Sequence, residues 1–279
     1  MPTLLLAAVA MTLMAANSLL TRAGVLDGTD PMAFAALRVA AGAATLAVLA
    51  RGRVPLRGAA RWGAAAALVV YLVGFSLAYR SLDAGLGALI LFATVQLALL
   101  GAGLARAERP APRRLAGMAL ALGGLGWLLW PGGGLRGTPT DVALMTAAGL
   151  GWAAYAFAGK FEPRPLSGNA GNFAVAAALF ALLAPVWWGA ALTPTGAACA
   201  VASGAVTSGL GYALLYRVLP RLGLAASGVA QLSVPVIAMI LGAVLLAEVP
   251  QARALMAGAL TLAGIALATF QPTIRSSAS

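Results

Sequence analysis

The sequence predicts an all-α polytopic membrane protein with ten transmembrane helices arranged as two inverted five-helix repeats. Three observations lead to this prediction. Hydrophobic residues make up 62% of the 279 residues and charged residues only 9%, whereas a soluble domain carries about 25% charged residues. Apolar runs of roughly the length of a membrane-spanning helix recur along the chain, and similar patterns appear in its two halves. A soluble domain of this composition would have to bury more apolar surface than it can enclose.

About 20 apolar residues in an α-helix cross a bilayer core, and ten runs in the chain are long enough to do so. They cover residues 3–21, 32–50, 62–80, 84–105, 115–131, 142–160, 170–191, 197–217, 224–246 and 254–271. The first run is predicted to be a membrane span and not a signal peptide. No basic residue precedes it, and no clear cleavage pattern follows it.

Several of the predicted breaks between spans are well marked. Residues 27–31 combine two aspartates with glycine and proline. Residues 51–61 and 106–114 each hold four arginines, and residues 131–134 read Pro-Gly-Gly-Gly. Charged residues are costly in hydrocarbon, and glycine and proline interrupt helices. We therefore expect each of these segments to lie outside the membrane.

The breaks in the second half are less obvious. Residues 165–216 carry no charge but are too many for one helix, and the best turn signal within them runs from Thr193 to Gly196. Arg217 and Arg221 then separate the eighth span from the ninth. These breaks complete the predicted set of ten spans.

Basic residues are divided unequally between the two sides that these spans define. Thirteen lie on the side of the N-terminus and four on the other, while Arg38 lies within a span. Cytoplasmic loops carry an excess of Lys and Arg. We therefore expect a multi-pass protein of the bacterial inner membrane with both termini in the cytoplasm.

The composition also excludes several functions. The chain has no histidine, so a Ser-His-Asp triad and a His-based zinc site are absent. The single Cys199 cannot form an intrachain disulfide or a thiolate cluster. The net charge of +11 suggests nucleic acid, but the arginines lie in short clusters and leave no domain-sized basic surface. We expect no enzyme activity, no cofactor, no metal site and no nucleic-acid partner.

An internal repeat relates the two halves. Residues 74–82 read GFSLAYRSL and residues 211–219 read GYALLYRVL, and Glu108-x-Pro likewise matches Glu248-x-Pro. The predicted repeats are residues 1–135 and 136–279, which together form one transport domain. Five spans per repeat make the second repeat inverted in the membrane, an arrangement that recurs in secondary transporters with a substrate site between the repeats.

This combination of features resembles the drug/metabolite transporter superfamily, its EamA-type branch and, within it, bacterial amino-acid exporters of the YddG type. Asn17, Pro31, Arg38 and residues 233–236 (Ser-Val-Pro-Val) also fit. The Trp-Gly pair often seen in the first span of the family is absent. The resemblance implies export of amino acids, including aromatic or neutral ones, or of related small metabolites. It also implies alternating access through a central cavity.

Aromatic residues inside the spans are candidates for lining that cavity. Tyr71, Phe75 and Tyr79 share one face of the third span at helical spacing. The other candidates, in the sixth and eighth spans, are Trp152, Tyr155 and Tyr212. Their rings suit stacking on an aromatic substrate or attraction of an ammonium group. Helix packing is the alternative role for all of them, and anchoring at the membrane interface is a further one for Tyr79.

Polar side chains inside the spans are the second set of candidates for substrate binding, with bridging between helices as the alternative. This set is Asn17, Gln96, Gln231 and Ser233. Pro235 is predicted to kink the ninth span, because it removes a backbone donor. Arg38 lies about 10 Å deep in the second span at 1.5 Å per residue. The two roles considered for it are binding of a substrate carboxylate and a structural role, and we expect the structural one, either snorkelling or bonding to backbone carbonyls.

Every acidic residue falls in a loop or at the end of a span. Ion-coupled transporters usually carry a carboxylate within the membrane, so we expect no obligatory coupling to protons or sodium. Alternatives are a multidrug or quaternary-ammonium exporter, an intramembrane Ser-Lys enzyme and a non-transporting membrane scaffold. The first usually has a membrane carboxylate, and the only lysine, Lys160, lies at a span end. The expected partners are a small-molecule substrate and membrane lipid, with a monomer favoured.

Overall fold

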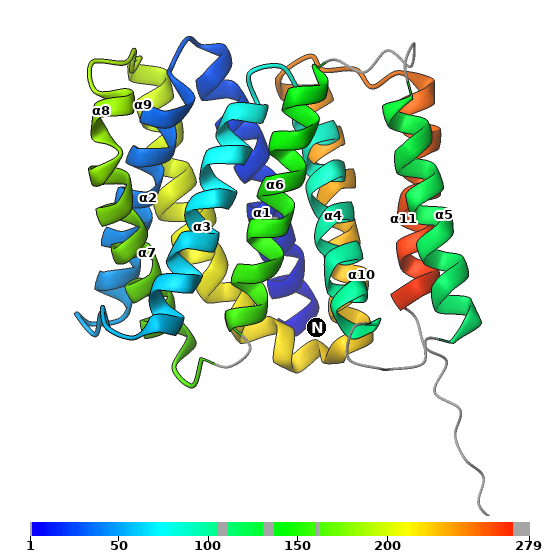
Figure 1. Cartoon of the computed structure of the whole chain (residues 1–279), viewed down its shortest axis with the longest axis horizontal. Helices are drawn as coiled ribbons and strands as arrows, with labels where there is room; N and C mark the ends of the chain where they lie inside the picture. The colour runs from blue at the N-terminus through cyan, green and yellow to red at the C-terminus, as the bar shows by residue number, and fades with distance from the viewer. Residues whose placement is uncertain (1, 105–110, 131–136, 160–161, 270–279) are drawn as a thin grey trace, which may run out of the picture.

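The computed structural model describes residues 2–104, 111–130, 137–159 and 162–269. Over these residues the chain is helical and contains no strand. The helices stand side by side and form one bundle (Figure 1). They are α1 (Pro2–Leu26), α2 (Pro31–Leu49), α3 (Ala59–Ala78), α4 (Ala84–Leu104), α5 (Pro112–Leu129), α6 (Pro139–Gly159), α7 (Pro165–Leu182), α8 (Ala184–Trp187), α9 (Pro194–Ala202), the π-helix η1 (Ser203–Leu210), α10 (Gly211–Leu245) and α11 (Ala252–Thr269).

Within the described residues, six helical segments are long and apolar enough to cross a membrane. They are Thr3–Leu26, Pro31–Leu49, Ala59–Ala78, Pro139–Gly159, Pro165–Leu182 and Pro194–Leu215. Shorter apolar helices cover Ala84–Leu99, Ala230–Leu245 and Ala252–Ala268. An all-helical polytopic membrane protein is confirmed, whereas the number of ten spans stays a prediction.

The starts of the long helices follow local sequence signals. Asp30 caps α2, since its Oδ1 accepts from the backbone N–H groups of Met32 (2.8 Å) and Ala33 (3.1 Å), and Pro31 occupies the first helical turn. Thr193 caps α9 in the same way and accepts from the N–H of Gly196 at 2.9 Å. The turn expected within the uncharged run therefore begins a new helix.

The connection between the predicted eighth and ninth spans differs from the expectation. Residues 218–223 were expected to separate two spans, but α10 continues through them to Leu245. Its 35 residues measure about 52 Å at 1.5 Å per residue, well beyond a bilayer core of about 30 Å. Figure 1 shows why this length fits, because the yellow start of α10 runs along the lower edge of the bundle and its orange part rises behind α4. The chain therefore changes direction within α10, at the lower edge of the bundle, and the helix does not end there.

Helices from opposite halves of the chain pack against each other. The main pairs are α5 with α11, α3 with α6, α1 with α10, and α2 with α7, and α4 packs on both α6 and α10. Figure 1 shows α5 and α11 together at one end of the bundle and α3 beside α6 in its centre. The contact between α5 and α11 is close, because an added Cβ at Gly124 would lie 2.6 Å from the Thr261 hydroxyl. Small residues permit such approach between membrane helices.

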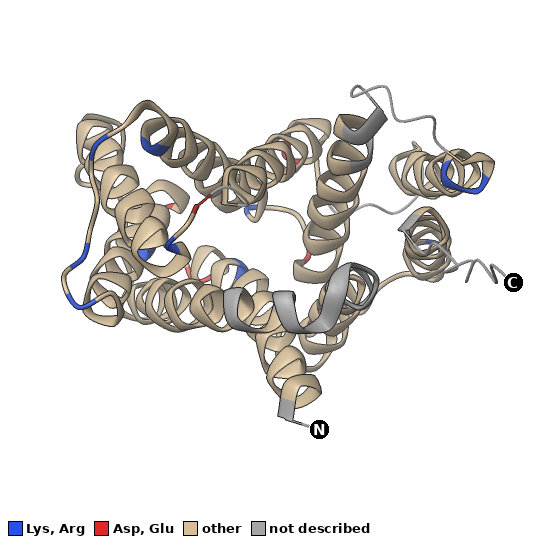
Figure 2. Ribbon diagram, turned by 90° about the horizontal axis from the view of Figure 1, so that it is seen from below, with Lys and Arg blue, Asp and Glu red and all other residues tan. Residues whose placement is uncertain are grey.

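The start of α1 and the end of α11 lie at the same, lower edge of the bundle (Figure 1). The loop between α2 and α3 also lies at this edge and carries Arg51, Arg53 and Arg57, all exposed. Figure 2 views this face from below and shows the blue basic positions along that loop. The lower face is the one for which the distribution of arginines predicts a cytoplasmic location.

Candidate functional site

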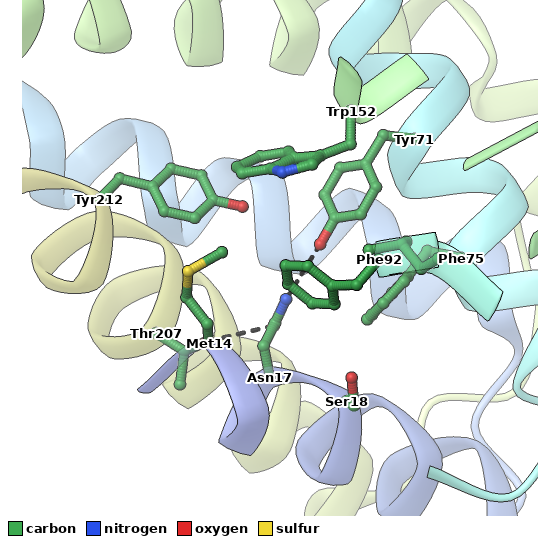
Figure 3. Close-up of a pocket in the computed structure, with 10 residues that line it drawn as sticks. Met14, Asn17, Ser18, Tyr71, Phe75, Phe92, Trp152, Thr207 and Tyr212 are labelled. Carbon is green, nitrogen blue, oxygen red and sulfur yellow. Dashed lines mark hydrogen bonds between the residues drawn. The ribbon is translucent and has the colours of Figure 1, made fainter. Parts of the chain in front are cut away.

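A small cavity of about 20 Å³ lies among α1, α3, α4, α6, η1 and α10, which is room for about one water molecule. Small-molecule sites measure about 300–1,000 Å³, so a substrate would fit here only after the walls of the cavity move apart. Both halves of the chain contribute to its walls (Figure 3). The lining residues are Met14, Asn17, Ser18, Tyr71, Phe75, Leu91, Phe92, Trp152, Thr207 and Tyr212.

Aromatic rings form much of the wall. Trp152 is the centre of this group, with ring centroids 5.1 Å from Tyr71, 5.0 Å from Tyr212 and 5.6 Å from Tyr155. The Tyr71 and Phe75 rings are also 5.1 Å apart. These tilted arrangements are favourable for ring quadrupoles. Helical spacing on α3 predicted that Tyr71 and Phe75 share a face, and the structure places both at the cavity with Trp152.

Asn17 lies below the aromatic rings in Figure 3 and joins α1 to two other helices. Its Nδ2 donates to the Tyr71 hydroxyl at 3.1 Å. Its Oδ1 accepts from the hydroxyls of Ser203 and Thr207 on η1. Asn17 therefore bridges helices, which was the alternative role considered for it, and it also lines the cavity. Substrate binding by Asn17 stays a prediction.

Arg38 lies beside this polar group and is fully buried, with 0% of its surface exposed. Its Nη2 donates to the Tyr71 hydroxyl at 2.9 Å, and both Nε and Nη2 lie 3.3 Å from the Ser208 hydroxyl. The guanidinium carbon is 5.2 Å from the ring centroids of Tyr71 and Phe75. Among the described residues its side-chain contacts are to hydroxyls of α3 and η1 inside the protein, in place of the expected snorkelling or carbonyl bonds. A structural role for Arg38 stays a prediction.

Several other candidates lie away from the cavity walls. Tyr79 is buried and donates to the carbonyl of Ala84 at 3.2 Å, and Tyr155 donates to Asn169 on α7. The Ser233 hydroxyl donates to the carbonyl of Ala230 in its own helix. Gln96, Gln231 and Pro235 are likewise not among the residues that line this cavity. Substrate binding by these six residues stays a prediction.

Sequence reasoning missed part of the site. Met14 and Ser18 lie within one turn of Asn17 on α1, and that spacing was a usable signal. Ser203, Thr207 and Ser208 belong to the run Ser-Gly-Ala-Val-Thr-Ser-Gly-Leu. Hydroxyl residues in an apolar segment often bond to their own helix, so nothing in that run indicated that it faces Asn17 and Arg38.

A buried ion-pair network lies at the upper end of the bundle. Arg22 at the end of α1 donates from Nε to Glu248 Oε1 at 2.8 Å, and the two side chains are 8% and 5% exposed. The same arginine donates to the carbonyls of Tyr79 and Arg80, both at 2.9 Å. Glu248 Oε2 accepts from the N–H of Ala84 at 2.6 Å. The network ties α1 and the connection between α3 and α4 to the segment after α10. The matching turn at Glu108 lies outside the described residues.

A second ion pair lies at the lower edge. Arg61 Nη2 is 2.7 Å from Glu162 Oε2, and Arg61 Nη1 donates to Asn172 Oδ1 at 2.9 Å. Arg61 begins α3 and its partners lie in and before α7. Both ends of the bundle therefore contain an arginine that joins the two halves of the chain.

Comparison with known proteins assigns the family. A model of the EamA-like transporter family matches residues 140–270. An uncharacterized protein of Pseudomonas aeruginosa is 47% identical over 272 residues, which cover 95% of this chain and 93% of that protein. A solved crystal structure shares the fold with a TM-score of 0.63 at 24% identity, covering 94% of this chain and 98% of its own. The chain belongs to the EamA-like transporter family of the drug/metabolite transporter superfamily.

Proposed function

We propose that this protein exports amino acids, aromatic or neutral ones among them, or related small metabolites, across the bacterial inner membrane. The observation that carries the proposal is the cavity whose walls come from both halves of the chain. Substrate sites at the interface of two repeats are a recurring feature of secondary transporters. The rings around Trp152 suit an apolar or aromatic substrate body.

The packing of the helices supports two inverted halves, residues 1–135 and 136–279. In an inverted repeat α1 corresponds to α6, and α3 corresponds to the helix formed by α9, η1 and the start of α10. The contact of α1 with this helix is therefore the equivalent of the contact between α6 and α3. Both contacts are present. The family match to residues 140–270 also begins close to the proposed boundary. These pairings give the halves the surfaces they need to move as units.

Alternating access requires that one end closes while the other opens. The upper network of Arg22 and Glu248 supports a state in which the upper end is closed, because it joins the halves through buried, short contacts. We place this end on the periplasmic side and both termini in the cytoplasm, from the 13-to-4 distribution of basic residues. A monomer is sufficient for this mechanism, since one chain supplies both halves.

Replacing Trp152 with Ala is expected to reduce amino-acid export at least tenfold. The indole contacts three tyrosine rings, and its loss removes stacking surface and leaves a larger cavity. The measurement is efflux of a labelled amino-acid panel from proteoliposomes. Trp188→Ala is the matched control, because Trp188 is 81% exposed and its loss should leave export unchanged. Equal export by both variants would remove the cavity from the mechanism.

The same panel separates the rival functions. A scaffold would move no solute, and a quaternary-ammonium exporter would move cationic compounds in preference to amino acids. No carboxylate lines the described cavity, which favours amino acids over cations. Gln231→Ala is expected to have a smaller effect than Trp152→Ala, since Gln231 is not a lining residue.

Transport is expected to proceed without an imposed proton or sodium gradient. A coupling ion is usually carried by an acidic group inside the membrane, and the described acids lie in loops or within one turn of a helix end. Counterflow of labelled substrate in proteoliposomes with identical pH and sodium on both sides measures this directly. Exchange that stops under these conditions and returns with a pH or sodium gradient would contradict the expectation.

A further inference from the structure

We propose that the substrate carries a carboxylate and that Arg38 supplies the positive charge that binds it. The inference rests on the proposed function, because it concerns the same cavity and names the chemical group that the cavity selects. Arg38 is then a substrate-binding residue, a role that its burial and its contacts support better than a structural one.

The first argument concerns charge. The ion pairs among the described residues join Arg22, Arg61 and Arg80 to acids near helix ends, and none of them includes Arg38. The arginine side chain is a cation, and Arg38 is 0% exposed. A buried charge without a counter-charge is strongly unfavourable. An anionic substrate provides the missing counter-charge.

The second argument concerns hydrogen bonds. Nε and Nη2 of Arg38 share the Ser208 hydroxyl, and Nη2 also donates to the Tyr71 hydroxyl. Nη1 is buried and has no hydrogen-bond partner. The guanidinium presents its donors as a planar fork that matches the two oxygens of a carboxylate. Nη1 and Nη2 together are therefore available for a carboxylate that replaces the neutral Tyr71 hydroxyl as acceptor.

The third argument concerns access from the cavity. Arg38 lies directly behind two of the cavity walls, with its guanidinium carbon 5.2 Å from the centroids of the Tyr71 and Phe75 rings. The Tyr71 hydroxyl is shared between Arg38 and Asn17, which also lines the cavity. Figure 3 shows this hydroxyl pointing toward Asn17 between the Trp152 and Phe92 rings. The inference therefore requires that the Tyr71 ring turns aside when a substrate binds, so that the carboxylate can reach the guanidinium.

The remaining walls do not select an amine by charge. The polar groups among the lining residues are an amide and hydroxyls, and the rest are aromatic or aliphatic. Such walls accept an apolar body, and their rings attract an ammonium group only weakly compared with a carboxylate partner. The cavity should therefore require the acid group of its substrate and tolerate the loss of the amine.

The test compares three probes on the wild-type protein. Phenylalanine has both groups, 3-phenylpropionate lacks the amine, and phenylalaninamide lacks the carboxylate. Competition against labelled phenylalanine counterflow in proteoliposomes gives their relative affinities. We expect both acids to compete at least tenfold better than the amide. Equal competition by the amide would overturn the role of the carboxylate while leaving transport intact. Absence of counterflow for every labelled amino acid tried would instead refute the proposed function and this inference with it.

Variants then assign the selectivity to Arg38. Arg38→Met is expected to lose the preference for acids, and its thermal unfolding temperature in detergent without substrate should equal or exceed that of the wild type, since a buried charge is replaced by an apolar side chain of similar length. Arg38→Lys keeps the charge but loses the fork, so its preference for acids should be intermediate. Arg57→Met is the control, because Arg57 lies exposed on the lower loop. Retention of a tenfold acid preference in Arg38→Met would overturn the inference. If neither Arg38 variant folds, the wild-type competition of the two acids against the amide still tests whether the substrate must carry a carboxylate.

Discussion

Replacing Glu248 with Gln is expected to destabilise the closed upper end by about 3–5 kcal/mol, which is typical when one partner of a buried ion pair is removed. Arg22 would keep two carbonyl partners and Asp83 at 3.8 Å, but it would lose its 2.8 Å contact with a carboxylate. The unfolding temperature in detergent and the rate of export both measure this. We expect both to fall, because the upper end no longer closes firmly.

The control for this substitution is Arg80→Gln at the same end of the bundle. Arg80 lies 3.5 Å from Asp30, and its side chain is 56% exposed, so its ion pair contributes about 0–1 kcal/mol. The unfolding temperature of this variant should stay near that of the wild type. An effect of Glu248→Gln no larger than that of Arg80→Gln would show that the upper network does not hold the halves together.

Replacing Gly74 with Ala is expected to cost about 1–3 kcal/mol from overpacking and to impair export. An added Cβ at Gly74 would lie 2.5 Å from the carbonyl oxygen of Leu144 and 3.2 Å from the backbone nitrogen of Ala148. Backbone atoms of α6 cannot move aside as a flexible side chain can. The added methyl group would therefore force α3 away from α6 at the centre of the bundle, where Tyr71 and Trp152 are in contact.

Gly63→Ala in the same helix is the matched control. An added Cβ at Gly63 meets no atom within 4 Å, and alanine favours a helix over glycine by up to about 1 kcal/mol. The control should therefore unfold at the wild-type temperature or above it. A stable, active Gly74→Ala variant would mean that α3 and α6 do not need to stay in close contact during transport.

The sequence predicted the fold where its signals are local. Asp30 with Pro31 and Thr193 with Pro194 mark helix starts, and both appear in the structure as caps. The stretch after Tyr212 misled the prediction, because charges usually mark loops between spans. The chain keeps its helix there, since backbone hydrogen bonds within a helix are compatible with a surface position at the edge of the bundle.

The site was predictable where one helix determines it. Tyr71 and Phe75 share a face of α3 by spacing alone. The partners of Arg38 were not predictable, because Tyr71 is 33 residues away in sequence and Ser208 is 170. Only the packing of α2 against α3 and η1 brings them together. Gln231 was proposed for the site because it is polar within a span, but polarity does not reveal which side of α10 faces the cavity.

The π-helical geometry of η1 has a consequence for how Asn17, which lines the cavity, is connected to Arg38, which lies behind its walls. Residue i+5 lies nearly above residue i in a π-helix, whereas five residues of α-helix turn the chain by about 140° beyond a full turn. Ser203 can therefore bond to Asn17 while Ser208, five positions later, bonds to Arg38. If η1 were to wind into an ordinary α-helix, one of these two hydroxyls would swing away from its partner. The Asn17 amide and the Arg38 guanidinium can therefore bond to the same helix at the same time only while η1 keeps its wider turn.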